Sequence, residues 1–270
     1  MLSPSNQTKL FGFNKIFKEF TNLYDLNKFP NKILFSGQKG LGKATFSYHL
    51  INFILSKDEE FSYELKNFSI NNQNRSFKLI QNKTHPNFNL IDVMPEKMNI
   101  DINQIRQLIS KFNKSSFNSK PRFILIDNIE LLNISSVNAL LKFLEEPDSK
   151  TSVGILVTDN QYALLDTIIS RAHVLKIAEP TIKEKKTIFK STSLSPFEIE
   201  VFALLFQNVE EATHANSSSH IKELLILFEY MLDQYQTKNF EFELNDIVIL
   251  LSSRKQLKKV EQLFRISEYY

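Results

Sequence analysis

The sequence predicts an α/β fold, in which a parallel five-stranded sheet with helices on both faces precedes a small helical domain and a short helical tail. Five short apolar runs alternate with segments whose apolar residues recur every three or four positions, the pattern of a parallel sheet with crossover helices. A glycine-rich turn follows the first apolar run, and a helix pattern begins directly after it. After residue 180 the strand pattern ends and helix patterns remain.

The expected elements follow in chain order. We expect strands at residues 33–35, 87–93, 123–129, 152–158 and 173–177. We expect helices between them, at residues 11–29, 44–56, 102–112, 135–144 and 162–169. Asp101 and either Ser135 or Ser136 are the expected N-caps, because short polar side chains accept hydrogen bonds from free N–H groups at a helix start. Residues 57–84 are polar and irregular, which indicates an insertion or a long connection.

The C-terminal third reads as helical. Helices are expected at residues 181–190, 196–206, 221–235 and 244–270, with a polar break at residues 213–219. Ser195 is the expected N-cap of the second of these helices, and Pro196 takes its first position. The sequence therefore predicts three parts, at residues 1–179, 180–215 and 216–270.

Composition excludes several classes of protein. Hydrophobic residues make up 42% and charged residues 23% of the chain, the net charge is +3, and there is no cysteine. The lack of cysteine excludes disulfides, thiol catalysis and a four-cysteine zinc site. The N-terminus has neither a basic segment nor an apolar segment of the export type, and no apolar run is long enough to span a bilayer, so we expect a cytoplasmic protein with no membrane partner.

The glycine-rich turn has the spacing of a phosphate-binding loop. Gly37, Gly42 and Lys43 stand at the positions of G-x-x-x-x-G-K-[ST], with Gly40 inside the loop. Such glycines let backbone N–H groups surround an anion, while the helix start and the lysine supply positive charge. The hydroxyl that holds Mg²⁺ is missing, because Ala44 follows the lysine.

Four further residues bear on hydrolysis. Thr45 stands one position too late to replace the missing hydroxyl, and it points elsewhere from the helix start. Asp127 ends a buried strand, where an acidic residue can hold Mg²⁺ through water, although a strand-end cap explains it as well. Asn128 follows it where an ATPase usually has a glutamate that polarises water, and Glu130 comes two residues later. We therefore predict that the chain is no competent ATPase and that its ATP binding is weak or absent.

Several segments beyond the loop carry a family resemblance. In chain order these are HPN at residues 85–87, ILIDN at 124–128, NALLKFLEEP at 138–147, ILVTDN at 155–160 and ISRA at 169–172. Together with the loop, they resemble the bacterial clamp-loader subunits of the AAA+ family, and most closely the delta-prime type of DNA polymerase III. The resemblance covers residues 10–180, and NALLKFLEEP is its most specific part.

The resemblance implies an architecture, a role and partners. It implies a P-loop core of the AAA+ type at residues 1–179, a helical lid at 180–215 and a collar-like tail at 216–270 that looks short. It also implies a non-hydrolysing subunit of the DNA polymerase III holoenzyme. This subunit would assemble with motor subunits of the tau/gamma type and with a delta subunit. The assembled complex would load the sliding clamp on primed DNA.

The resemblance also implies roles for two residues. In the family, a Ser-Arg-Cys segment offers its arginine to ATP held by a neighbouring motor subunit, and here Ser170-Arg171-Ala172 keeps the arginine. A surface or salt-bridged arginine is the simpler interpretation of Arg171 by itself. Thr158 matches the family's first sensor position, although a β-branched residue at a strand end is ordinary.

Some family features are missing or weak. Relatives often carry a four-cysteine zinc module between the first helix and the HP segment, but residues 57–84 contain no cysteine, so we expect no zinc. The second-sensor motif is not recognisable. The histidines have no ligand spacing, so we expect no metal site. A basic cluster could contact DNA phosphates or simply form a solvated face; its members are Arg106, Lys111, Lys114, Lys120 and Arg122.

Two other functions remain open at this point. The chain could be a self-sufficient AAA+ ATPase or a motor-type subunit that binds and hydrolyses ATP, with Thr45 and Glu130 in place of the missing groups. It could also be a free-standing nucleotide-dependent scaffold without a clamp partner. ATP turnover by the isolated chain distinguishes the first from a non-hydrolysing subunit, and co-purification with motor subunits distinguishes the second.

Overall fold

The chain divides into two compact units, Met1–Glu179 and Pro180–Tyr270. This computed structural model describes residues 3–93, 99–112, 120–145 and 152–217, together with residues 222, 225 and 226.

The first unit is built on a five-stranded parallel sheet, as predicted. Its strands are β1 (Lys32–Ser36), β2 (Phe88–Ile91), β3 (Arg122–Ile126), β4 (Ser152–Thr158) and β5 (His173–Lys176). Their order in the sheet is β2-β3-β4-β1-β5, and every neighbouring pair is parallel. The carboxyl ends of all five strands therefore lie at one edge of the sheet, where β1 and β4 end side by side with Ser36 opposite Thr158.

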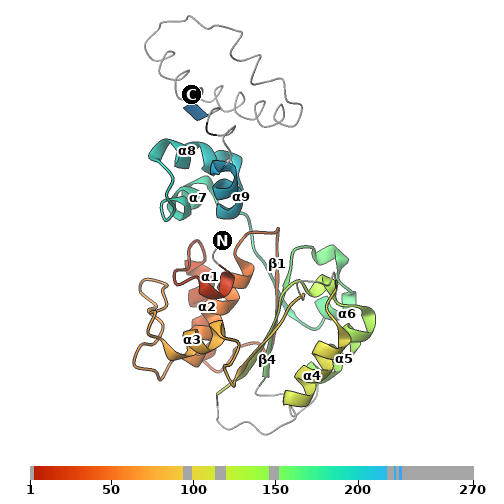
Figure 1. Ribbon diagram of the computed structural model, residues 1–270. Coiled ribbons are helices and arrows are strands. Elements are labelled where there is room, and N and C mark those ends of the chain that lie inside the picture. The colour runs from red at the N-terminus through yellow and green to blue at the C-terminus, as the bar shows by residue number, and fades with distance from the viewer. Residues whose placement is uncertain are drawn as a thin grey trace, which may run out of the picture. The chain divides into compact units, whose positions relative to one another are not determined.

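Helices cover both faces of this sheet (Figure 1). One face carries α1 (Asn14–Asp25), α2 (Lys43–Leu55) and α3 (Arg75–Gln81), and the other carries α4 (Ile102–Phe112), α5 (Ile134–Glu145) and α6 (Asp166–Ile169). Successive strand residues point to opposite faces, so Ile33 and Phe35 join the first core while Leu34 joins the second. The near-continuous apolar runs in the sequence arise because both faces of each strand are buried.

The polar segment at residues 57–84 is more ordered than we predicted. It contains α3, whose N-cap Asn74 accepts a hydrogen bond from the backbone N–H of Phe77. The same Asn74 side chain donates to the carbonyl of Phe61 at 2.6 Å and accepts from Asn52 at 3.0 Å. Tyr63 and Phe77 are buried in the first core. The interpretation as an irregular connection was wrong for Arg75–Gln81, which form a helix, because the buried asparagines stabilise this part through contacts that its own polarity pattern does not reveal.

Other predicted boundaries need correction. The third strand ends at Ile126 rather than at residue 129, because Asn128 takes a left-handed conformation (φ 56°) and a 3₁₀ turn, η2 (Ile129–Leu131), follows. The next helix is capped by Asn133, whose side chain accepts from the N–H of Ser136 at 2.8 Å, and not by a serine. The helix expected at residues 162–169 is two short pieces, η4 (Gln161–Ala163) and α6.

The second unit has its own helical core. Its helices are α7 (Ile182–Phe189), α8 (Pro196–Leu205) and α9 (Val209–Asn216). Capping boxes start the first two, through Thr181 with Glu184 and through Ser195 with Glu198. The predicted break at residues 213–219 was wrong for its first half, which continues α9. The helices expected at 221–235 and 244–270 lie outside the described residues apart from 222, 225 and 226.

Candidate functional site

The loop between β1 and α2 has the backbone geometry of a phosphate-binding loop. Gly40 and Gly42 have positive φ angles of 81° and 80°, which L side chains rarely adopt. Gly42 is also the N-cap of α2. A Cβ atom at Gly37 would lie 2.6 Å from the carbonyl oxygen of Ile177, directly after β5. The three glycines of the motif are therefore required by the shape of the loop, whether or not it binds an anion.

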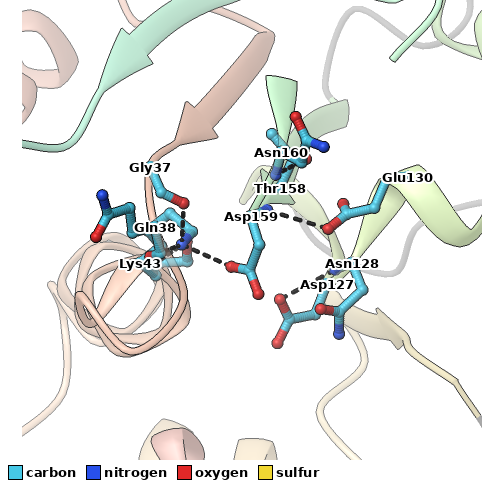
Figure 2. A network of polar contacts seen from close by, with 10 residues as sticks. Gly37, Gln38, Lys43, Asp127, Asn128, Glu130, Thr158, Asp159 and Asn160 are labelled. Carbon is cyan, nitrogen blue, oxygen red and sulfur yellow. Dashed lines mark hydrogen bonds and ion pairs between the residues drawn. The ribbon is translucent and has the colours of Figure 1, made fainter. Parts of the chain in front are cut away.

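The lysine of the motif is buried and fully engaged within the chain. The Lys43 Nζ donates to the carbonyl oxygens of Gly37 at 2.7 Å and Gln38 at 2.6 Å. It also forms an ion pair with Asp159 Oδ1 at 2.7 Å. Figure 2 shows these three partners converging on one ammonium group. Only 3% of the Lys43 side chain is exposed.

The end of β4 supplies the acidic partner. Thr158, the predicted sensor residue, is fully buried, and its hydroxyl accepts from the N–H of Asn160 at 3.1 Å. The backbone N–H of Asp159 donates to Glu130 Oε1 at 3.1 Å (Figure 2). These bonds fix the turn after β4, so that the Asp159 carboxylate faces Lys43 across the adjacent strand end.

A second acidic group lies at the end of β3. Asp127 accepts a hydrogen bond at 3.1 Å from the N–H of Asn128, whose side-chain amide contacts Asp92 at 3.4 Å. Burial, reinforced by the Asp92 carboxylate and to a lesser extent by Asp159, raises the pKa of Asp127 from 3.8 to about 6, although the Asn128 N–H and Lys43 oppose the rise. The Asp127 carboxylate thus lies among the charges of Asp92, Asp159 and Lys43.

The raised pKa of Asp127 predicts a pH-dependent cost in stability. The folded chain holds this proton up to about pH 6, whereas the unfolded chain loses it near pH 3.8. Asp127 therefore lowers the free energy of unfolding as the pH rises from about 4 to about 6, by about 3 kcal/mol in all. Asp127→Asn cannot ionise, and its Oδ1 can still accept from Asn128. We expect it to be more stable than the wild type above pH 6.

Urea unfolding of both chains from pH 4 to pH 8 measures this effect. The difference between the two free energies of unfolding should be small near pH 4 and reach its full size by about pH 7. A difference that stays constant across this range would show that Asp127 has an ordinary pKa.

The structure brings most of the predicted nucleotide-site residues together. Gly37, Gly40, Gly42, Lys43, Asp127 and Thr158 all lie at the carboxyl edge of the sheet. Thr45 lies in the first turn of α2, two residues beyond Lys43. Arg171 lies at the opposite end of the strands, near their amino ends. It precedes β5, and the first residue of β5 pairs with Ile33 at the start of β1.

The sequence did not identify Asp159 as a residue of this site. Asp159 lies 116 positions from its lysine partner, and nothing in its own neighbourhood identifies that partner. The available signal was its place directly after the buried run of residues 152–158. Neighbouring strands of a parallel sheet have their carboxyl ends at the same edge. An acidic residue directly after one strand therefore lies near a loop that begins directly after the neighbouring strand.

The HPN segment, which contributed to the resemblance, has a structural role here. The Nδ1 atom of His85 accepts from the N–H of Asn87, and its Nε2 atom lies 3.2 Å from the hydroxyl of Ser76. Asn87 is buried and donates to the carbonyls of Lys120 at 3.0 Å and Pro121 at 3.2 Å. The segment thereby fixes the starts of β2 and β3 against each other.

The three cations Arg106, Lys111 and Lys120, all within the described part of the chain, do not form one surface. Arg106 and Lys111 are exposed on α4, as a solvated helix face requires, and Lys114 lies outside the described residues. Lys120 instead donates to the carbonyl of Leu55 at 2.9 Å, at the end of α2, and pairs with Asp58. Because α2 and α4 cover opposite faces of the sheet, these cations do not combine into one phosphate-binding patch.

The described residues contain neither a metal-binding cluster nor a membrane-spanning helix. No group of three or more histidine and acidic side chains in the described ranges is arranged to hold a metal ion. No helix in the same part of the chain has the length and apolarity needed to cross a bilayer.

The chain is similar in sequence to subunits of DNA polymerase III. A family model described as DNA polymerase III, delta subunit, matches residues 12–181. The DNA polymerase III subunit delta' of Bacillus subtilis (strain 168) is 29% identical over 213 residues, which cover 77% of this chain and 60% of the relative. The protein of the same name from Buchnera aphidicola subsp. Baizongia pistaciae is 23% identical over 255 residues, which cover 90% of this chain and 72% of the relative. The chain thus spans 60% of the first relative's length.

A solved structure supports the fold. A RuvB variant from Thermotoga maritima matches with a TM-score of 0.52 at 14% identity, over 92% of this chain and 72% of that structure. At this identity the likeness shows the fold alone, which is that of the AAA+ proteins.

Proposed function

We propose, on the premise that the chain belongs to the DNA polymerase III delta-subunit family, that this delta-prime-like clamp-loader subunit does not hydrolyse ATP itself. In the proposed role it docks beside a motor subunit of the tau/gamma type and completes that neighbour's ATP site with Arg171. A delta subunit, the sliding clamp and primed DNA are the other proposed partners. ATP binding by the chain itself is weak or absent in this role.

The composition of its own loop supports the non-hydrolysing part of the proposal. Ala44 cannot supply the hydroxyl that would hold Mg²⁺, and the amide of Asn128 cannot accept a proton from water. Asn128 instead directs its amide toward Asp92. Glu130, the alternative base, already accepts a hydrogen bond from the Asp159 backbone.

The position of Arg171 is the observation that carries the proposal. The loop follows Ser36 at the end of β1, whereas Arg171 precedes His173 at the start of the parallel strand β5. Arg171 and the chain's own loop are therefore separated by the length of a strand. The side chain is exposed, and its Nη1 donates to the carbonyl of Thr167 in α6 at 3.1 Å. An exposed guanidinium at this edge suits a phosphate on another subunit, because it stays charged and binds oxygens in pairs.

Two measurements on the full chain test the proposed function. We expect the chain to co-purify with motor and delta subunits when the three are co-expressed, and to show no magnesium-dependent ATP turnover when isolated. Lys43→Ala is the matched control for the second measurement, since it removes the loop lysine. Turnover by the isolated wild type that disappears in Lys43→Ala would instead favour the self-sufficient ATPase. Failure to co-purify would favour the free-standing scaffold.

A further inference from the structure

The ammonium group of Lys43 has no donor left for a ligand. A lysine ammonium carries three N–H donors and no acceptor. Its three partners are the carbonyls of Gly37 and Gln38 and the carboxylate of Asp159, all within 2.7 Å. The first two bonds hold the lysine to its own loop. The third crosses to the end of β4, and it is the one that an incoming anion would have to replace.

The Asp159 carboxylate is well placed to resist replacement. The bond to Lys43 is charge-assisted, and the lysine side chain is 3% exposed while that of Asp159 is 30% exposed. Two hydrogen bonds hold the turn that carries Asp159. The Asp159 N–H donates to Glu130, and the Asn160 N–H donates to the hydroxyl of Thr158. A phosphate entering here would also meet the negative charges of Asp159 and the nearby Asp127 (Figure 2).

We propose that the Asp159 carboxylate is an internal ligand of the phosphate-binding loop, which takes the lysine donor that a phosphate oxygen would otherwise accept and so closes the loop to nucleotides. The ion pair joins the loop after β1 to the end of β4. The loop keeps the backbone shape of a phosphate-binding loop, but its lysine is already bound to the Asp159 carboxylate. This proposal concerns binding to the chain's own loop, deepens the non-hydrolysing role proposed above, and does not depend on Arg171.

The test is calorimetric titration of the full chain with inorganic tripolyphosphate and with ATP, both without magnesium. We expect the wild type to bind tripolyphosphate with a Kd no lower than about 1 mM. Asp159→Asn removes one like charge and leaves Lys43 only a neutral acceptor, which a phosphate oxygen displaces more easily than a carboxylate, so we expect its affinity to rise roughly tenfold or more. Adding Lys43→Met to Asp159→Asn should abolish the gain.

Asp25→Asn is the matched control. It changes the net charge by the same amount, but Asp25 pairs with Lys57 at 2.8 Å on the surface, where both side chains are about half exposed. An equal gain in Asp25→Asn, or no gain in a folded Asp159→Asn, would overturn the proposal. Circular dichroism checks folding, and Asp159→Ser replaces the asparagine variant if that variant does not fold.

The affinity of the wild type for tripolyphosphate tests the proposal independently of the variants. Binding of tripolyphosphate with a Kd below roughly 10 µM would show that the loop is open, whatever the variants do. If the loop binds phosphate in this way and still hydrolyses no ATP, the internal ligand and the weak binding are disproved, while the non-hydrolysing role and the assignment of Arg171 stand. Turnover of ATP would instead contradict the proposed function.

Discussion

Arg171→Ala in a reconstituted clamp loader is expected to slow ATP turnover at the neighbouring subunit's site by about 10³-fold, the lower end of what an arginine supplied to a phosphoryl transfer contributes. Charge develops on the transferred phosphoryl group in the transition state, and a guanidinium held beside it stabilises that charge. Because Arg171 is exposed and lies away from its own loop, its removal should leave the fold and the stability of the isolated chain nearly unchanged.

Single-turnover kinetics are the appropriate measurement, because other ATP sites in the complex would mask the loss at steady state. Gel filtration should show that the variant still assembles. Arg171→Lys keeps the positive charge but loses the two-pronged geometry, so we expect it to restore only part of the rate. Arg75→Ala, at an exposed position on α3, is the control for loss of a surface arginine. Clamp-dependent turnover that is unchanged in Arg171→Ala would remove this assignment.

Acidification is expected to destabilise the first unit, through one buried and one half-buried histidine that the fold holds in their neutral form. Burial lowers the pKa of His49 from 6.5 to about 4, partly offset by its hydrogen bond to the carbonyl of Gln7. Its other ring nitrogen lies 2.9 Å from the hydroxyl of Tyr63. Burial likewise lowers the pKa of His85 to about 4, although the nearby Glu59 opposes this.

The direction of the effect follows from the lowered pKa values. The unfolded chain binds a proton at each histidine below about pH 6.5, whereas the folded chain does so only near pH 4. The stability that the neutral rings contribute is therefore complete above about pH 6.5 and is lost as the pH falls toward 4. His49 accounts for about 2.5 kcal/mol between pH 7 and pH 4.5, and the less buried His85 for less, because solvent screens it. Asp127 changes stability in the opposite direction, so comparison with a variant is needed to isolate one ring.

His49→Gln provides that comparison. It should be less stable than the wild type at pH 7, because the bonds to Tyr63 and Gln7 are disturbed, but it should lose about 2.5 kcal/mol less on going to pH 4.5. Urea unfolding at the two pH values measures both quantities. His173→Gln, at an exposed histidine, should follow the wild type. Parallel losses in His49→Gln and the wild type would mean that the buried ring does not resist protonation.

Much of this protein was determined by local sequence. The apolar runs at residues 123–126 and 152–158 could only be strands buried on both faces, and the sheet contains them with small shifts at their ends. Gly40 and Gly42 have φ angles near 80°, which L side chains rarely adopt, and Gly37 leaves no room for a Cβ beside Ile177. Ala44 and Asn128 could be recognised as missing groups because a motif fixes which residue type belongs at each position.

The tertiary structure decided what depends on partners far away in the chain. Asn52 and Asn74 order a segment that looked irregular, through bonds between residues 22 positions apart. Asp159 reaches Lys43 only because β4 and β1 pair in parallel and end together. The parallel pairing of β5 with β1 separates Arg171 from the loop. Conformational preferences act between near neighbours and can be read along the chain. The partner of a buried charge, by contrast, is set by strand order and register, which appear only when the sheet is assembled.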